Sequence, residues 1–156
     1  MKLTVVAVGH KMPGWVDAAF ADYAKRLPRN FAFALVEVRP EARSSGKSVL
    51  QLLSAEAARI EAATPQGAAR VVCDEHGEDL TTMRLSEKLR HWQDSATDIA
   101  MLIGGPDGLA KSIKDSARLS IRLSSLTLPH GLARVLLVEQ IYRAWSILQS
   151  HPYHRE

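Results

Sequence analysis

The stretch Ile99-Ala-Met-Leu-Ile-Gly-Gly-Pro-Asp-Gly108 joins five apolar residues to a turn that contains three glycines. A short apolar run that ends at Gly and Pro is typical of a strand buried on both faces, as in a parallel sheet. Ligands in such sheets bind beside the carboxyl ends of the strands, where glycine lets a backbone approach another group closely. The stretch therefore predicts a buried strand over 99–103 and a candidate binding turn over 104–108.

Strand and helix patterns alternate on both sides of this stretch. Short apolar runs predict the other strands, at 3–8, 33–38, 71–74 and 119–123. Helical spacing and capping signals predict helices at 15–27, 48–63, 82–92, 109–116 and 131–150. This order predicts one α/β domain over residues 1–156, with a mostly parallel sheet flanked by helices. We expect Trp15, Tyr23 and Trp92 to lie in its core.

Composition excludes several classes of protein. The 156 residues are 46% hydrophobic and 24% charged, which is typical of a globular domain and not of a disordered chain. Cys73 is the single cysteine, so we expect no disulfide framework and no cysteine metal cluster. The apolar run at the N-terminus is too short for a signal peptide or a membrane span, so we expect a cytoplasmic protein with no membrane partner.

Common catalytic motifs are missing from the sequence. The turn 104–108 lacks the G-x-G-x-x-G spacing of dinucleotide sites, and Ala110 stands where a P-loop needs glycine before Lys111-Ser112. The sequence has no H-E-x-x-H zinc motif and no G-x-S-x-G nucleophile elbow, so we expect neither metal catalysis nor a serine hydrolase. On its own, the turn is read equally well as a tight link between a strand and a helix.

A second unusual loop, Leu123-Ser-Ser-Leu-Thr-Leu-Pro-His130, follows the last predicted strand. It is more apolar than most loops, and Pro129 marks the start of the next helix. Backbone N–H and C=O groups in such a dry setting suit the edge of a flat heterocycle such as adenine. The alternative is an ordinary strand–helix link.

Positive charge gathers in the polar loop 39–47, which contains Arg39, Arg43 and Lys47. The whole chain carries a net charge of +3, which permits a polyanionic partner without requiring one. We read this loop either as solvated or as a contact for RNA phosphates.

The last predicted helix is apolar on two sides. Leu136 and Ile147 lie nearly opposite its main apolar arc, so both sides need to be covered. We expect one side to face the sheet and the other to face a second copy of the chain, in a twofold homodimer. Arg134 lies within the main arc and is either paired at the interface or aimed into a site. Glu139 and Arg143 are four residues apart, which favours an ion pair on the helix surface.

Several stretches together resemble one family: 6–13 (VAVGHKMP), 102–109 (LIGGPDGL), 123–130 (LSSLTLPH), 142–146 (YRAWS) and 151–156 (HPYHRE). The likeness runs from the first residue to the last. The chain is similar to the SPOUT-class methyltransferases that modify N3 of a pseudouridine in 23S ribosomal RNA of assembled ribosomes. This resemblance implies an α/β fold with a C-terminal trefoil knot, a homodimer, and S-adenosylmethionine as methyl donor. It implies no metal and no DNA partner.

The resemblance also implies which residues bind the donor. Carried onto this sequence, they are Cys73, Gly104, Gly105, Leu123, Ser124, Ser125, Leu126, Thr127 and Leu128. Relatives can carry an aliphatic residue in place of Cys73, which should serve as a small apolar wall. Asp107 stands where some relatives have Glu. Ser125 stands where others have Ala, which should matter little if the loop is read through its backbone.

The terminal segment 151–156 contains the residues that we expect to act on the acceptor. Pseudouridine N3 must lose its imide proton, or its anion must be stabilised, as it attacks the methyl group. We expect His154 to act as base or hydrogen-bond partner, Arg155 and Arg143 to stabilise the anion or grip phosphate, and Tyr153 to stack on a base. At a dimer interface this tail could reach a pocket built partly by the partner.

Three alternatives stay open at this point. The tail could be a plain solvated end. The protein could be a related methyltransferase that acts on transfer RNA, or a catalytically silent dimeric RNA-binding protein of the same fold.

Overall fold

The sheet has five strands, all parallel, in the order β2-β1-β4-β3-β5. The computed structural model describes residues 1–154, apart from the side chains of Asn30 and Ser45. The strands are β1 (Leu3–Val8), β2 (Phe33–Val38), β3 (Ala69–Asp79), β4 (Ile99–Ile103) and β5 (Leu119–Arg122). Every residue of β1 and of β4 is buried, as the apolar runs predicted. The α/β class and the parallel sheet predicted from sequence are therefore confirmed.

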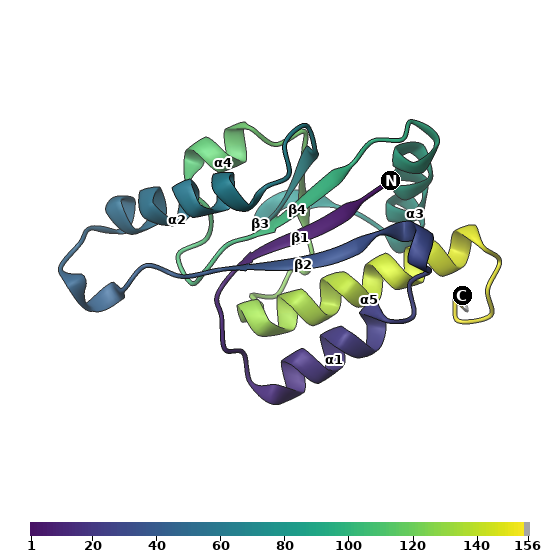
Figure 1. Ribbon diagram of the computed structural model, residues 1–156, viewed down its shortest axis with the longest axis horizontal. Helices are drawn as coiled ribbons and strands as arrows, with labels where there is room; N and C mark the ends of the chain where they lie inside the picture. Colours follow the sequence, from purple (N-terminus) through teal and green to yellow (C-terminus); the bar gives the residue numbers. More distant parts are fainter. Residues whose placement is uncertain (155–156) are drawn as a thin grey trace.

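Helices cover both faces of the sheet (Figure 1). On one face α1 (Gly14–Ala24) and α3 (Thr82–Asp94) pack against α5 (His130–Leu148), and α2 (Val49–Ala63) and α4 (Lys111–Asp115) lie on the other. Side chains alternate along β1, so Val5 packs into the first layer and Val6 into the second. The two cores share this sheet, which fixes the carboxyl ends of the strands along one edge.

Most element boundaries agree with the predicted ones, and β3 differs the most. It runs to Asp79 where the sequence predicted an end at Asp74, with a register shift between Cys73 and Glu78. Gly77 permits this extension, because a Cβ there would lie 2.5–2.8 Å from backbone atoms of Ile121. The apolar run alone could not predict a strand that continues through polar residues.

One core prediction was wrong. Trp15 is 56% exposed, whereas Tyr23 and Trp92 are partly buried against the core as expected. The buried face of α1 is made by Val16 and Phe20. Trp15 lies one residue, and so about 100° of helical turn, from Val16, which directs it away from that face.

Helix α5 is largely covered by its own chain. Most of its main arc is buried, with Trp145 and Leu148 half-buried, and Leu136 and Ile147 on the other side are also half-buried. Pro129 caps the helix, which begins at His130, one residue before the predicted start. Among residues 1–154, no helix is long and apolar enough to span a membrane.

Candidate functional site

Three of the predicted donor-site segments meet at the carboxyl edge of the sheet. Strand β3 lies between β4 and β5, and Cys73 stands in register with Ile103 on one side and Ile121 on the other. Gly104 follows Ile103 directly, and Leu123 comes two residues after Ile121. The fold thus brings Cys73 of β3 beside the turn 104–108 and the loop 123–128, which follow the carboxyl ends of β4 and β5, where parallel sheets bind ligands.

The turn 104–108 is closed tightly on itself. Gly108 donates its N–H to the Gly105 carbonyl at 2.9 Å and takes a positive φ of 78°. A Cβ on Gly104 would lie 2.4 Å from the Gly108 carbonyl carbon and oxygen, so any side chain there would collide with backbone. Glycine is therefore required at 104 to shape this turn.

Cys73 has the properties of an apolar wall. Desolvation raises the pKa of its thiol to about 12, so the side chain is protonated at neutral pH. Nucleophilic cysteine chemistry needs the thiolate, which this environment disfavours. The predicted packing role of Cys73 is consistent with that chemistry, while its contact with a donor stays a prediction.

The loop 123–128 presents backbone groups and apolar side chains together. Leu123 packs against the core, and the Ser124 hydroxyl accepts the Leu126 N–H at 2.9 Å. The backbone amides of Ser125, Thr127 and Leu128 have no hydrogen-bond partner within residues 1–154. Free amides beside apolar side chains fit a flat heterocycle read through its edge, and the contact of this loop with such a ligand stays a prediction.

Arg134 fixes the end of β1 next to this edge. It is 1% exposed, and its guanidinium donates to Glu37 Oε1 at 2.6 Å, to the Gly9 carbonyl at 2.7 Å and to the Val8 carbonyl at 3.2 Å. Gly9 has a φ of 120°, and a Cβ there would lie 2.9 Å from Arg134 Nη2. Arg134 is thus paired within its own chain, an arrangement that neither of the alternatives drawn from the sequence included.

The tail follows the C-terminal end of α5 and folds back against the middle of the helix. The Tyr153 hydroxyl donates to Glu139 Oε1 at 3.1 Å, and Arg143 donates to the same oxygen from Nε at 2.9 Å. The Arg143 guanidinium also lies 4.8 Å from the centre of the Tyr153 ring, which packs edge-on against Tyr142. Arg143 therefore supports the tail from inside the chain, and its predicted contact with RNA stays a prediction.

His154 is half-buried, and neither of its ring nitrogens has a hydrogen-bond partner in the described part of the chain. A buried imidazole without partners is unusual, since buried polar atoms are normally satisfied. Its predicted role as a base stays a prediction. Arg155, the third residue predicted to act on the acceptor, lies outside the described residues.

The carboxyl edge of the sheet, where the predicted donor residues Cys73, Gly104 and 123–128 lie, is called the donor edge below. The donor edge and the tail lie at opposite ends of α5 (Figure 1). The loop 123–128 comes just before this helix and the tail just after it. A helix of 19 residues spans about 28 Å. Within one chain, therefore, the structure does not bring the predicted donor and acceptor residues together.

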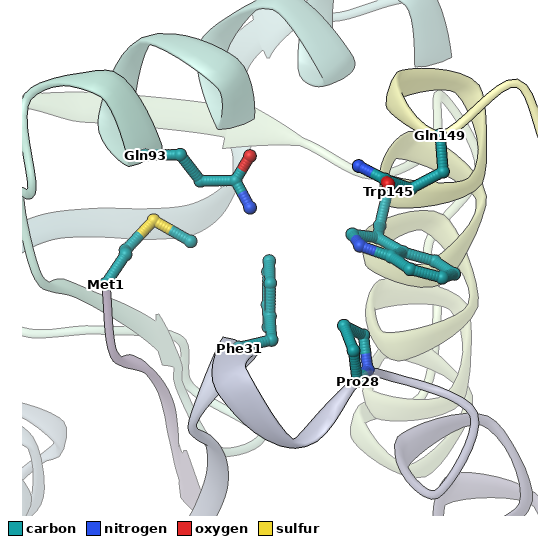
Figure 2. A pocket seen from close by; sticks show the side chains of 6 residues that line it. All are labelled: Met1, Pro28, Phe31, Gln93, Trp145 and Gln149. Carbon is teal, nitrogen blue, oxygen red and sulfur yellow. The ribbon is translucent and has the colours of Figure 1, made fainter.

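A cavity of about 320 Å³ lies at the tail end and not at the donor edge. Figure 2 shows the amides of Gln93 and Gln149 directed into it, with Trp145 and Phe31 below them. None of the predicted donor residues lines this cavity. The carboxyl edge stays the predicted donor site because of the strand geometry there, and cavity size does not support it.

Comparison with known proteins agrees with this geometry. A family model described as "Predicted SPOUT methyltransferase" matches residues 1–154. The chain belongs to the SPOUT methyltransferase family. Membership implies the C-terminal knot that the resemblance predicted.

Within residues 1–154, no three His, Cys, Asp or Glu side chains gather into a possible metal site.

Curated relatives of this SPOUT chain match over nearly its whole length. A protein of Bordetella avium named "Ribosomal RNA large subunit methyltransferase H" is 58% identical over 155 residues, covering 99% of both chains. Proteins of the same name from Bordetella petrii and Ralstonia pickettii are 56% identical with the same coverage.

Two solved structures share the fold at low identity. A probable methylase family protein from Haemophilus influenzae has a TM-score of 0.61 at 14% identity, covering 99% of this chain and 70% of its own. A probable methyltransferase from Bordetella pertussis has a TM-score of 0.56 at 17% identity, covering 92% of this chain and 95% of its own.

Sequence reasoning missed His130 as a residue of the donor edge of this SPOUT domain. It lies at the start of α5, 3.7 Å from the position of a Cβ on Gly9. Desolvation, together with the charges of Arg134 and Arg43, lowers the pKa of His130, so its imidazole is neutral at pH 7. Its place directly after Pro129, at a strand-to-helix junction, was the signal that could have identified it.

Proposed function

We propose that this protein is an S-adenosylmethionine-dependent methyltransferase that methylates N3 of a pseudouridine in 23S ribosomal RNA. The observation that carries the proposal is the family membership together with identity of 56–58% to proteins named "Ribosomal RNA large subunit methyltransferase H". The proposed donor site is the carboxyl edge formed by Cys73, Gly104, Gly105 and the loop 123–128. Free backbone amides and a protonated thiol suit a donor with a flat heterocycle.

Methyl transfer from S-adenosylmethionine requires the protein mainly to position the two reactants. S-adenosylmethionine supplies an electrophilic methyl group on a sulfonium. The chain must hold the donor, exclude water and align the acceptor nitrogen with that methyl group. The imide proton at N3 must leave during the attack, which calls for a base or a cation beside the acceptor. We assign that role to the tail, with His154 as the first candidate.

The distance between the two ends of α5 supports a homodimeric enzyme. The tail follows the end of α5 that lies opposite its own donor edge, on a helix of about 28 Å, so we infer that it does not complete a site there. Apolar side chains are also exposed at the donor edge: Trp15, Leu126 (76% exposed) and Leu132. We propose a twofold dimer in which the tail of each protomer meets the partner's donor edge, covering these side chains.

The proposed substrate is ribosomal RNA within the ribosome, in the cytoplasm, and not free RNA. Tight binding of naked RNA depends on many cations that neutralise phosphates. Here the net charge is only +3, and Arg43 and Lys47 of the loop 39–47 are engaged in ion pairs within the chain. Specificity should therefore depend on the shape of the assembled particle.

Comparison of ribosomal RNA from cells with and without the protein tests the proposal. A methyl group on N3 blocks Watson–Crick pairing, so we expect a reverse-transcriptase stop at one pseudouridine that disappears with the protein. Purified protein with radiolabelled S-adenosylmethionine should restore the stop on ribosomes. A stop restored in transfer RNA instead would indicate the related transfer-RNA activity, and binding to ribosomes without methyl transfer would indicate a silent RNA-binding protein.

A further inference from the structure

The guanidinium of Arg43 connects the turn 104–108 to helix α2. Arg43 lies in the short 3₁₀ turn Arg43–Ser45, between β2 and α2. Its Nε and Nη2 donate to Asp107 Oδ2 at 3.2 and 2.9 Å. Its Nη1 donates to Glu56 Oε1 at 2.5 Å and to the Glu41 carbonyl at 2.9 Å. A single side chain thus contacts the turn, α2 and its own loop.

Glu56, a buried residue of α2, accepts the hydrogen bond from Arg43 on the side of the helix. Its side chain is 2% exposed, and its Oε1 also accepts the Glu41 backbone N–H at 2.9 Å. Burial of a carboxylate is costly unless a cation compensates it, and Arg43 is the cation in contact with it. The network therefore holds the Arg43 guanidinium in one place.

The second oxygen of Glu56 is directed toward the turn. Glu56 Oε2 is buried and has no hydrogen-bond partner within residues 1–154. This oxygen and Arg43 Nη2 each lie 3.5 Å from the position of a Cβ on Gly105. A buried carboxylate and its cation therefore lie in van der Waals range of the glycine turn, and a Cβ at Gly105 would lie 3.1 Å from Val8 Cγ1.

Asp107 is the other end of the connection. It occupies the tip of the turn, and in the described part of the chain the hydrogen bonds to its carboxylate come from Arg43 alone. Within the described residues, the turn itself is otherwise closed by the short bridge between Gly105 and Gly108. The position of the tip thus depends on a side chain from a distant part of the sequence.

The other cations near the loop 39–47, Lys47 and Arg59, pair with Glu41 and not with the turn 104–108. Lys47 pairs with Glu41 at 2.6 Å, and Arg59 pairs with the same carboxylate. Both stabilise the loop 39–47, and within the described residues neither donates a hydrogen bond to the turn 104–108. Lys47 therefore offers a matched control: a basic residue in the same loop, with an ion pair, but without contact to the donor edge.

We infer that Arg43 and Glu56 are positioning residues of the donor site, which hold Asp107 and so keep the turn 104–108 in the shape that binds the donor. This inference rests on the proposed function, because it takes the turn as part of the donor site. It also changes the reading of the loop 39–47. Arg43 acts on the protein's own turn, and is not free for an RNA phosphate.

Donor binding by Asp107→Asn and Arg43→Lys tests the inference. We expect S-adenosylmethionine to bind each variant about tenfold more weakly by calorimetry, because a charge-assisted contact to the turn is lost or shortened. In methyl transfer to ribosomes, the KM for the donor should rise while kcat changes less than twofold. Lys47→Met should bind the donor as the wild type does. Wild-type affinity in Asp107→Asn overturns the inference.

Arg43→Ala is a poor test, because it leaves the Glu56 carboxylate buried without its cation and could unfold the loop. The double variant Arg43→Met/Glu56→Leu removes both charges and retains apolar volume. We expect it to fold with wild-type circular dichroism and still to bind the donor about tenfold more weakly. A folded double variant with wild-type donor affinity would contradict the positioning role.

Hydrogen exchange gives a readout that needs no donor. The Gly108 amide, bonded to Gly105, should exchange about tenfold faster in free Asp107→Asn than in the wild type, while amides of α2 stay unchanged. Unchanged exchange at Gly108 overturns the inference whether or not the donor binds. Failure of the wild type to bind S-adenosylmethionine, with faster exchange in Asp107→Asn, overturns the proposed function instead.

Discussion

The Tyr153 hydroxyl donates to Glu139 Oε1 at 3.1 Å, so the last described turn of the chain is bonded back to the helix that precedes it. Desolvation and hydrogen bonds with Tyr23 and Glu139 raise the pKa of Tyr153. The phenol is therefore neutral at physiological pH and serves as a donor, not as a base. Its contact with Glu139 fixes the position of Tyr153, and so of the neighbouring His154, relative to α5.

Tyr153→Phe should loosen the tail and leave the donor edge intact. We expect methyl transfer to fall about tenfold, with unchanged affinity for S-adenosylmethionine and a stability loss of about 1 kcal/mol for one hydrogen bond. Radiolabel transfer, calorimetry and urea unfolding give the three values. Tyr142→Phe is the control, since no hydrogen bond of the Tyr142 hydroxyl occurs within residues 1–154. Equal effects of both variants would mean that the aromatic packing matters and the bond does not.

His154→Ala tests the proposed base. General acid–base catalysis contributes about 10²–10⁴ in rate, so we expect a loss of at least about a hundredfold in kcat with unchanged donor affinity. The exposed His91 provides a control, and His91→Ala should retain full activity. Unchanged transfer by His154→Ala would exclude the catalytic role.

Mixing two inactive variants tests the proposed dimer. Gly104→Ala disrupts the donor turn by collision with Gly108, and His154→Ala disrupts the tail. If each tail serves the partner's donor edge, random mixing gives heterodimers with one intact site and recovers about a quarter of wild-type activity. Sites built within one chain would recover none. Equilibrium ultracentrifugation of each variant checks that dimers persist.

His130 should make stability depend on pH. Its pKa is lowered in the folded state, chiefly by desolvation, so around pH 6 the unfolded chain binds more protons at this residue than the folded chain does. Stability from this residue is therefore present above the unfolded pKa of about 6.5 and is lost as pH falls below it. His130→Gln should flatten that slope in urea unfolding between pH 5 and 8. An identical slope in the variant would show that His130 does not contribute.

Arg134→Met should be strongly destabilising. The substitution leaves the Val8 and Gly9 carbonyls without their donor at the end of β1. We expect a loss of about 3 kcal/mol in urea unfolding, because buried acceptors cost about 1–3 kcal/mol each when unsatisfied. Arg118, which is exposed, supplies the control, and Arg118→Met should change stability by less than about 0.5 kcal/mol.

Local signals in the sequence predicted the framework well. The runs at 3–8, 33–38 and 99–103 became strands with those bounds, and Ser48 with Gln51 forms the capping box that begins α2. Apolar runs and caps depend on neighbouring residues, so a single sequence contains them. The extension of β3 depends on Gly77 packing against Ile121, which lies 44 residues away in the sequence and leaves no local pattern.

The candidate site also contains some features that the sequence predicted and others that depend on contacts between distant residues. The glycine turn and the loop 123–128 were visible as unusual residue types after strands. Arg43 was assigned to a solvated loop or an RNA contact, since its partners Glu56 and Asp107 lie 13 and 64 residues away. Likewise, the family resemblance indicated both the donor residues and the tail residues. The fold shows that these two groups lie at opposite ends of α5.

Helix α5 acts as a rigid spacer between the two halves of the proposed site. A deletion of one residue within it would shorten the spacing by about 1.5 Å and rotate the tail by about 100° relative to the donor edge. Both ends could retain all their local contacts after such a change and still fail to face their counterparts in a second chain. The register of α5 is thus a determinant of activity that no single side chain carries, and we expect insertions within this helix to be poorly tolerated.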